Sequence, residues 1–226
     1  MLQFDRITKN GTDRIGFSID TLVIAGWAGR DVAAIEHHIE ELAAIGVPRP
    51  STTPLYYRVA AQTLTQADKL VVLGPDSSGE VEPVVIALAD GLWIGIGSDH
   101  TDRKAETFGI ALSKQLCGKP VGRQLWSYAE IEGHWDDLVL RSWANIDGQR
   151  VLYQESAVSS LRTPRDLICK YANADTLPAG TLMFCGTPGA IGGIRPATRF
   201  EMELHDPVLN RSLTHGYDID VLPVVS

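Results

Sequence analysis

Three carboxylates within residues 79 to 103 have the types and the spacing of a divalent-metal site. Glu80 and Glu82 open a run rich in β-branched residues, and side chains two residues apart on a strand project from the same face, roughly 6 to 7 Å apart. Asp90-Gly91 is a strong hairpin signal, so the next strand should return beside the first. The sequence therefore predicts that Asp99 comes close to the two glutamates.

Carboxylates held that close repel one another, and burying them is costly unless a cation or protons neutralise them. Mg²⁺, Mn²⁺ and Ca²⁺ prefer oxygen ligands, and Mg²⁺ usually leaves several positions to water or substrate. The alternative is that the two glutamates belong to the solvated face of an amphipathic strand. Val84 and Ile86 continue the glutamate face as apolar residues, which indicates a buried face and favours the metal site.

A helix is predicted to begin at Asp31, its N-cap, and to run to about Ile45. His38 lies on the flank of its apolar face, and Glu41 is close enough in sequence to contact it. A histidine with a neighbouring glutamate suits a general base that activates water. One alternative is that the dyad is the adjacent pair, His37 and Glu40. The other is that all four residues, His37, His38, Glu40 and Glu41, belong to a hydrated helix surface.

Four more side chains are candidates for binding a substrate. Arg103 and Lys114 lie on a predicted helix over about 103–116. There they offset the acidic cluster, bind a substrate carboxylate, or face solvent. The glycine-rich turn near Thr187 lacks the ending of a phosphate-binding loop, but it can bring backbone N–H groups and a hydroxyl close to a small anion. Tyr57 either lines a pocket or belongs to the core.

Composition limits the class of protein. The chain has 226 residues, of which 44% are hydrophobic and 21% charged, and its net charge is −8. We expect one domain over residues 1–226, in contact with neither nucleic acid nor anionic membrane. The apolar stretches are shorter than the ~20 residues of a membrane span, and the first residues lack a signal peptide's apolar core. We therefore expect a cytoplasmic protein.

The order of predicted elements indicates a mixed α+β fold. Residues 1–25 read as a small β element, residues 126–160 as strands around a turn, and 208–226 as a C-terminal tail. A helix is predicted from Thr163-Pro164 to Asn173, followed by a strand over 199–204. The three cysteines, at positions 117, 169 and 185, are too scattered for a disulfide framework and are predicted to be buried thiols.

Four blocks of residues together resemble the ordered motifs of the fumarylacetoacetate hydrolase superfamily. The resemblance covers roughly residues 22 to 207, and we expect the part of the chain with this family's fold to span residues 26–207. The blocks are Glu80-Val81-Glu82, Ser98-Asp99-His100-Thr101-Asp102-Arg103, Ser113-Lys114, and the run from Cys185 to Gly192. The resemblance implies a mixed β-roll or sandwich with short flanking helices, commonly a homodimer.

The resemblance also implies roles for single residues. Glu80, Glu82 and Asp99 would hold Mg²⁺ or Mn²⁺, with Ca²⁺ also able to bind such a site. The water-activating His-x-x-Glu dyad is best matched by His38 and Glu41, because a leucine follows as in the family. Lys114 matches the family's active-site lysine and is the third catalytic candidate. Arg103 and Thr187 match further positions of the family and would bind the substrate, and Tyr57 is another candidate for binding it.

These observations favour a metal-dependent hydrolase that cleaves a carbon–carbon bond in a small 1,3-diketo or acylpyruvate-like carboxylic acid. Two alternatives use the same residues. One is a 2-oxo-acid decarboxylase, hydratase or dehydratase, since the same metal would stabilise an enolate in each case. The other is a metal-dependent binding scaffold without catalytic activity.

Overall fold

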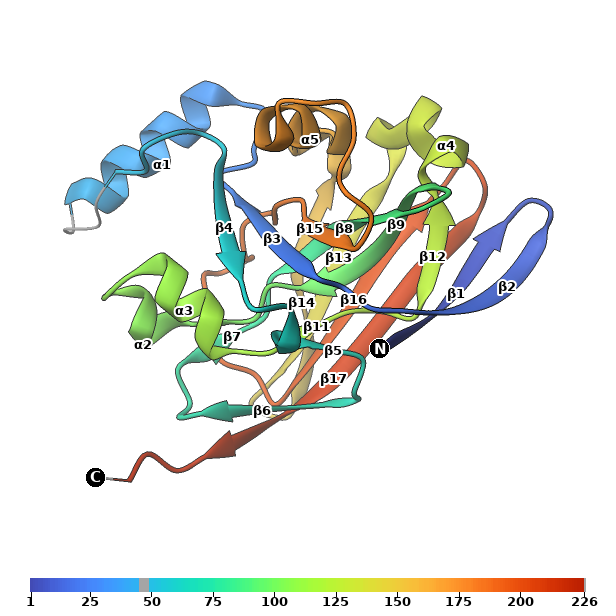
Figure 1. Cartoon of the computed structure of the whole chain (residues 1–226). Coiled ribbons are helices and arrows are strands. Elements are labelled where there is room, and N and C mark those ends of the chain that lie inside the picture. Colours follow the sequence, from blue (N-terminus) through green and yellow to red (C-terminus); the bar gives the residue numbers. More distant parts are fainter. Residues whose placement is uncertain (45–48, 226) are drawn as a thin grey trace.

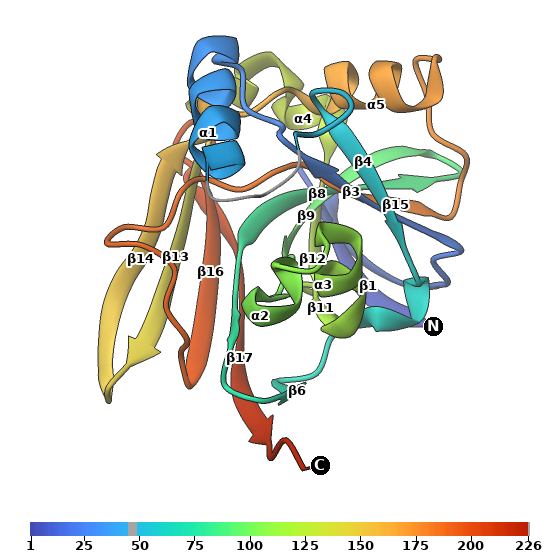
Figure 2. The ribbon, with the colours of Figure 1, turned by 90° about the vertical axis from the view of Figure 1, so that its left-hand side faces the viewer.

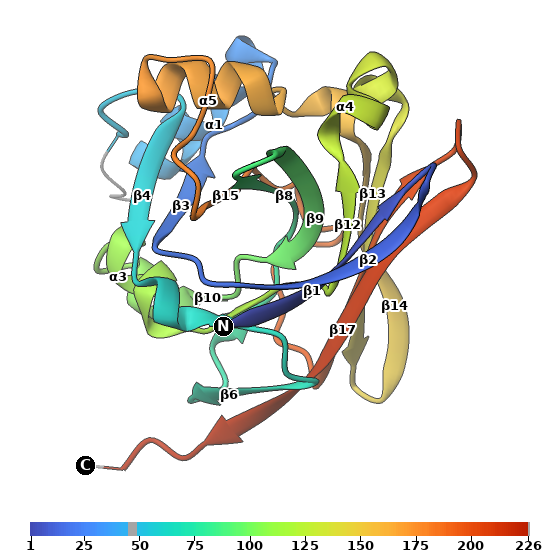
Figure 3. The same cartoon turned by 45° about the vertical axis from the view of Figure 1, so that its right-hand side comes forward.

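Two large β-sheets pack against each other in the computed structural model, which describes residues 1–44 and 49–225 apart from the side chains of residues 38, 41, 42 and 44 (Figures 1 and 2). The eight-stranded sheet has the order β2-β1-β12-β9-β8-β15-β3-β4, and it is strongly curved (Figure 3). Its strands are β1 (Leu2–Thr8), β2 (Gly11–Phe17), β3 (Thr21–Gly26), β4 (Leu55–Val59), β8 (Val81–Leu88), β9 (Gly91–Ser98), β12 (Gln124–Ser127) and β15 (Thr181–Phe184).

The five-stranded sheet has the order β14-β13-β16-β17-β6. Its strands are β6 (Lys69–Leu73), β13 (Val139–Ile146), β14 (Gln149–Ala157), β16 (Arg199–Asp206) and β17 (Arg211–Leu222). Within the part of the chain that the structure describes, there are also two short pairs of strands. They are β7 (Ser77–Ser78) with β10 (Thr101–Asp102) and β5 (Leu64–Thr65) with β11 (Lys119–Pro120).

The described residues form five short α-helices, which flank the sheets. Helices α1 (Val32–Ala44), α4 (Tyr128–Ile131) and α5 (Pro164–Ala172) lie at one end of the molecule, whereas α2 (Arg103–Glu106) and α3 (Ile110–Leu116) lie together below β4 (Figure 1). The predicted fold class, a mixed α+β roll with short flanking helices, is confirmed. None of the helices formed by the described residues has the length and apolar character that a membrane span needs.

The central strands of the eight-stranded sheet are buried on both faces. Val81, Val85 and Ala87 of β8 pack into the cluster that lies between the two sheets, whereas Val84 and Ile86 pack into a second cluster on the opposite face. A strand buried on both faces reads as a continuous apolar run, as β8 does. The glutamate side of β8 is therefore buried, as the sequence predicted.

Strands β8 and β9 form the predicted hairpin. Leu88 pairs with Gly91 across the turn, and the register continues without a shift to Val81 and Ser98. This register brings the two chain segments beyond the strands side by side, and the backbone N–H of Asp99 donates to the carbonyl of Glu80 at 3.0 Å. The local sequence thus fixes which residues meet at the end of the hairpin.

Helices α1 and α5 begin where the sequence predicts. Asp31 Oδ1 accepts hydrogen bonds from the first turn of α1, namely from Ala33 N at 2.9 Å and Ala34 N at 3.0 Å. Thr163 caps α5 by accepting from the backbone of Asp166 at 3.2 Å. The predicted end of the first helix at Ile45 lies outside the described residues.

Three sequence predictions about secondary structure were wrong. The helix expected over 103–116 is two helices, α2 and α3, because the chain between them passes through Gly109 in an extended conformation. The segment 128–137, expected to be strand, is helical, and its helical spacing buries Tyr128, Ile131 and Trp135. The expected tail 208–226 contains β17, which lies between β16 and β6.

Candidate metal centre

Glu80, Glu82 and Asp99 converge at the end of the β8–β9 hairpin. One carboxylate oxygen of each residue lies within 4.8 Å of the others. Glu82 is 2% exposed and Asp99 is fully buried, whereas the side chain of Glu80 is 18% exposed and borders the cavity described below. The geometry is that of a site with oxygen ligands only, which is the donor set that hard divalent cations prefer.

Two lysines contact the most buried of the three carboxylates. Lys114 Nζ donates to Asp99 Oδ2 and lies 3.7 Å from Glu80 Oε2. Lys119 is fully buried, donates to the carbonyl of His100 at 2.5 Å, and places its Nζ 2.9 Å from Asp99 Oδ1. The sequence analysis assigned Lys119 no role, because its contact with Asp99 depends on the pairing of β11 with β5, far away in the sequence.

The carboxylates of Glu82 and Asp99 differ in electrostatic environment. Burial and the charges of Asp99 and Glu80 raise the pKa of Glu82 well above its ordinary value. Burial acts in the same direction on Asp99, but the charges of Lys114 and Lys119 outweigh it and hold the pKa of Asp99 at about 2. Burial lowers the pKa of Lys114, yet the charges of Asp99 and Glu80 raise it overall, so this lysine stays protonated.

A divalent cation fits this environment for two reasons. The Glu82 carboxylate is buried where ionisation is unfavourable without additional positive charge. Asp99 Oδ1 is buried and meets no hydrogen-bond geometry among the described residues, although the Lys119 ammonium lies 2.9 Å away as its ion-pair partner. A cation would supply the charge that Glu82 lacks and could be coordinated by that oxygen.

Arg103 anchors Glu80 from the side of α2. Its guanidinium donates to three acceptors at once, which are Ser78 Oγ at 2.8 Å, Glu106 Oε2 at 3.0 Å and Glu80 Oε1 at 2.8 Å. A planar guanidinium suits such multiple recognition. In the described structure Arg103 therefore holds the acidic cluster, and its predicted contact with a substrate carboxylate stays a prediction.

The turn that carries Thr187 closes over Glu82. Gly186 has φ 98°, its N–H donates to Glu82 Oε2 at 2.6 Å, and a Cβ at this position would lie 2.7 Å from Ala28 Cβ. Glycine is therefore required by both backbone conformation and space. The hydroxyl of Thr187 donates to the carbonyl of Val81 at 2.9 Å, so it can offer a ligand an acceptor but no further proton in this geometry.

Gln154 of β14 connects the two halves of the site, and the sequence analysis missed it. Its Oε1 accepts from Val81 N at 3.0 Å, and its Nε2 donates to Thr187 Oγ1 at 2.8 Å and to the carbonyl of Pro188 at 2.6 Å. The side chain is 2% exposed. A single buried amide thus joins the residue between the two glutamates to the turn above them.

A cavity of about 750 Å³ opens above the carboxylates. Of the predicted site residues, Tyr57, Glu80, Glu82, Arg103, Lys114 and Thr187 line it. Tyr57 lies with its ring centroid 5.8 Å from Lys114 Nζ, and burial raises the pKa of its hydroxyl. The backbone of His38 and Glu41 belongs to α1, whose residues Ala34 and Ile35 line the cavity, but the two side chains lie outside the described residues.

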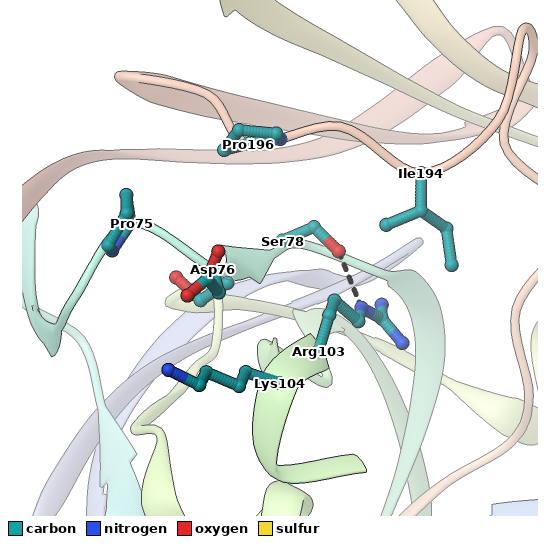
Figure 4. A pocket seen from close by; sticks show the side chains of 8 residues that line it. Pro75, Asp76, Ser78, Arg103, Lys104, Ile194 and Pro196 are labelled. Atoms are coloured by element: carbon teal, nitrogen blue, oxygen red, sulfur yellow. Dashed lines mark hydrogen bonds between the residues drawn. The ribbon is translucent and has the colours of Figure 1, made fainter. Parts of the chain in front are cut away.

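Arg103 also separates this cavity from a smaller one. The second cavity has a volume of about 540 Å³ and lies between β7, the start of α2 and the loop at 194–196 (Figure 4). Figure 4 shows the hydrogen bond between Arg103 and Ser78, with Lys104 beside Arg103 and with Ile194 and Pro196 across from them. Arg103 and Ile194 line both cavities.

The fold and the acidic cluster define a mixed β-roll with a candidate divalent-cation centre on the floor of a cavity. By sequence, the chain belongs to the family described as "Protein of unknown function (DUF2848)", whose profile matches residues 25–217. A comparison with curated proteins gives no match.

Solved structures with a similar fold include 2-keto-3-deoxyarabinonate dehydratase, with a TM-score of 0.65 and 16% identity over 95% of this chain and 79% of that chain. The structure of 2-keto-3-deoxy-D-arabinonate dehydratase complexed with magnesium and 2,5-dioxopentanoate has a TM-score of 0.61 and 14% identity, and the match covers 96% of this chain and 79% of that chain. The 4-oxalocrotonate decarboxylase from Pseudomonas putida G7, complexed with calcium and acetate, has a TM-score of 0.55 and 16% identity, and the match covers 92% of this chain and 79% of that chain. At these identities the likeness shows the fold.

Proposed function

We propose that this protein is a divalent-metal-dependent enzyme of the fumarylacetoacetate hydrolase superfamily that acts on a small 2-oxo acid. The observation that carries the proposal is the convergence of Glu80, Glu82 and Asp99 with Lys114, since Glu80, Glu82 and Lys114 also line the cavity. The solved structures that contain magnesium or calcium share the fold and support a cation of this type. Mg²⁺ and Mn²⁺ are the proposed cofactors.

The residues of the site have separate tasks in this proposal. When bound, the cation would supply a Lewis acid beside a carboxylate and its neighbouring keto oxygen. Lys114 stays protonated and would stabilise negative charge that develops on the substrate. The backbone of the turn at Thr187 would position the acid, and Arg103 and Lys119 would keep Glu80 and Asp99 in place.

Hydrolytic cleavage of a carbon–carbon bond in a 1,3-diketo or acylpyruvate-like acid is the first candidate reaction. It requires a base that activates water, and His38 with Glu41 is the proposed pair, on the basis of the sequence resemblance. His38→Ala should abolish turnover and leave Mn²⁺ affinity nearly unchanged. Turnover at the wild-type rate would remove His38 from the reaction.

A lyase reaction on the same 2-oxo acid is the second candidate. The dehydratase and the decarboxylase with this fold favour it. Product analysis separates the reactions, because hydrolysis yields two acids, decarboxylation releases carbon dioxide, and dehydration conserves the carbon skeleton.

The metal site can be tested by titrating Mn²⁺ into the metal-free protein by calorimetry. Glu82→Gln keeps the size of the side chain and an acceptor for Gly186 N–H, but it removes the charge. We expect one specific site in the wild type and a loss of affinity of at least about 100-fold in Glu82→Gln, in line with loss of a ligand from a three-carboxylate centre. Glu155→Gln on β14, a surface glutamate paired with Arg141, is the matched control and should bind Mn²⁺ normally. Equal binding by both variants would refute the metal centre.

A further inference from the structure

Part of the cavity lining is a set of apolar side chains, which we call the apolar wall. It consists of Trp27, Ala28, Ile35, Ile110, Leu161 and Ile194, which come from the loop before α1, from α1, from α3 and from two later loops. The cavity lining therefore combines apolar side chains with the charged groups Glu80, Glu82, Arg103 and Lys114. A ligand that fills the cavity must match both.

This wall is held in place by backbone hydrogen bonds. Arg30 N donates to the carbonyl of Ser160 at 2.9 Å, and Arg162 N donates to the carbonyl of Ala28 at 2.8 Å. These bonds tie the loop before α1 to the segment that carries Leu161. Trp27 sits in this loop with φ 58°, a conformation that is uncommon for a bulky residue and that the surrounding structure must impose. The apolar wall is therefore already formed.

The polar side chains along the same wall are used within the protein. Asp31 caps α1, and Thr107 Oγ1 donates to the carbonyl of Lys104 at 2.8 Å. Ser156 and Ser160 both donate to the carbonyl of Ala157, at 3.1 and 2.9 Å. The protons of these hydroxyls are therefore already used, so the groups can accept a hydrogen bond from a ligand but have no further proton to donate.

We infer that the acid bound here carries an apolar substituent, an alkyl chain of several carbons or an aryl ring, which lies against this wall while its 2-oxo acid end meets the carboxylate centre. The inference rests on the proposed function for the position of the acid end. The cavity volume is in the range of pockets that enclose drug-sized ligands, so there is room for such a substituent beyond the reacting carbons. Each buried methylene group should tighten binding about fourfold.

Binding of unreactive 2-oxo acids to the Mn²⁺-loaded protein tests the inference, with calorimetry as the readout. From 2-oxobutanoate to 2-oxooctanoate we expect Kd to fall at least about 50-fold, since four methylene groups are added. The polyhydroxylated acid 2-oxogluconate should bind no more tightly than 2-oxobutanoate. Equal affinity for the two alkyl acids, or tighter binding of 2-oxogluconate, would overturn the inference.

Variants locate the effect on the wall. Ile35→Asn should reduce the affinity ratio between 2-oxooctanoate and 2-oxobutanoate at least about tenfold, because it places an amide against the apolar chain. Leu112→Asn is the matched control, since Leu112 is 50% exposed on α3 and does not line the cavity. Circular dichroism and thermal unfolding confirm that both variants fold. An unchanged ratio in Ile35→Asn would contradict the inference.

Turnover assays with the matching acylpyruvates keep this inference separate from the proposed function. If the long-chain acid binds tightly but the acylpyruvates yield no product, the apolar site is supported and the proposed reaction is refuted. Turnover without a preference for long or aryl chains would refute the apolar site and would still support the proposed reaction. Failure of all three acids to bind would refute both.

Discussion

Gln154 Nε2 donates to Thr187 Oγ1 at 2.8 Å, while Oε1 of the same amide accepts from Val81 N at 3.0 Å. The five-stranded sheet thereby fixes the distance between the strand that carries Glu82 and the turn that covers it. A residue outside the acidic cluster thus controls its geometry.

Replacing Gln154 by leucine should weaken the site. The change leaves Val81 N–H without its partner and frees the Thr187 turn, so we expect a loss of about 1–3 kcal/mol in the free energy of unfolding and roughly tenfold weaker Mn²⁺ binding. Urea unfolding and calorimetry measure the two effects. Leu152→Gln, on the same strand at a partly exposed position, is the control. Wild-type Mn²⁺ affinity in Gln154→Leu would show that Gln154 has no role in positioning the ligands.

Replacing Lys119 by methionine should destabilise the metal-free protein strongly. Asp99 would lose one of its two buried positive partners, and breaking a buried ion pair typically costs about 3–5 kcal/mol. Lys69→Met, a change at an exposed lysine paired with Asp220 at 3.4 Å, should have little effect. Both are measured by urea unfolding.

Mn²⁺ should restore part of the stability lost in Lys119→Met, because a bound cation replaces the missing charge. The stabilisation by Mn²⁺ is therefore expected to be at least as large in the variant as in the wild type. A fully stable Lys119→Met protein without metal would disprove the importance of this pair.

The effect of Mn²⁺ on stability should increase with pH. Because the pKa of Glu82 in the folded protein lies above its ordinary value of 4.5, the metal-free protein loses stability from this group as pH rises from about 4.5 through the folded pKa. Mn²⁺ binds the ionised carboxylate, so log Kd should fall by up to about one per pH unit over the same window. Calorimetry between pH 5 and 8 measures this dependence. A flat profile for the wild type, or the same slope in Glu82→Gln, would contradict it.

Of the three cysteines, Cys169 alone should react with a thiol reagent in the native protein. The sequence analysis predicted three buried thiols, but Cys169 is exposed on α5. Cys117 and Cys185 are buried, and burial raises the pKa of both thiols, that of Cys117 to about 11. We therefore expect one reactive thiol per chain at pH 8 and three in urea. Cys169→Ser should show none before unfolding.

The sequence was sufficient to predict the carboxylate cluster, because a hairpin is a local structure. The Asp90-Gly91 turn and the alternation of β8 set the register, and the register places Asp99 beside Glu80. The N-caps of α1 and α5 were predictable for the same reason, since a cap bonds residues two or three positions away.

Only the tertiary structure decided which groups surround that cluster. Lys119 contacts Asp99 through the pairing of β11 with β5, and Gln154 comes from the other sheet. The sequence near Glu82 therefore contains no pattern that predicts either contact. The apolar wall depends in the same way on contacts between the loop before α1 and the segment around Leu161. Sequence spacing determines what one hairpin brings together, whereas the packing of distant segments determines the charge balance and the shape of the cavity.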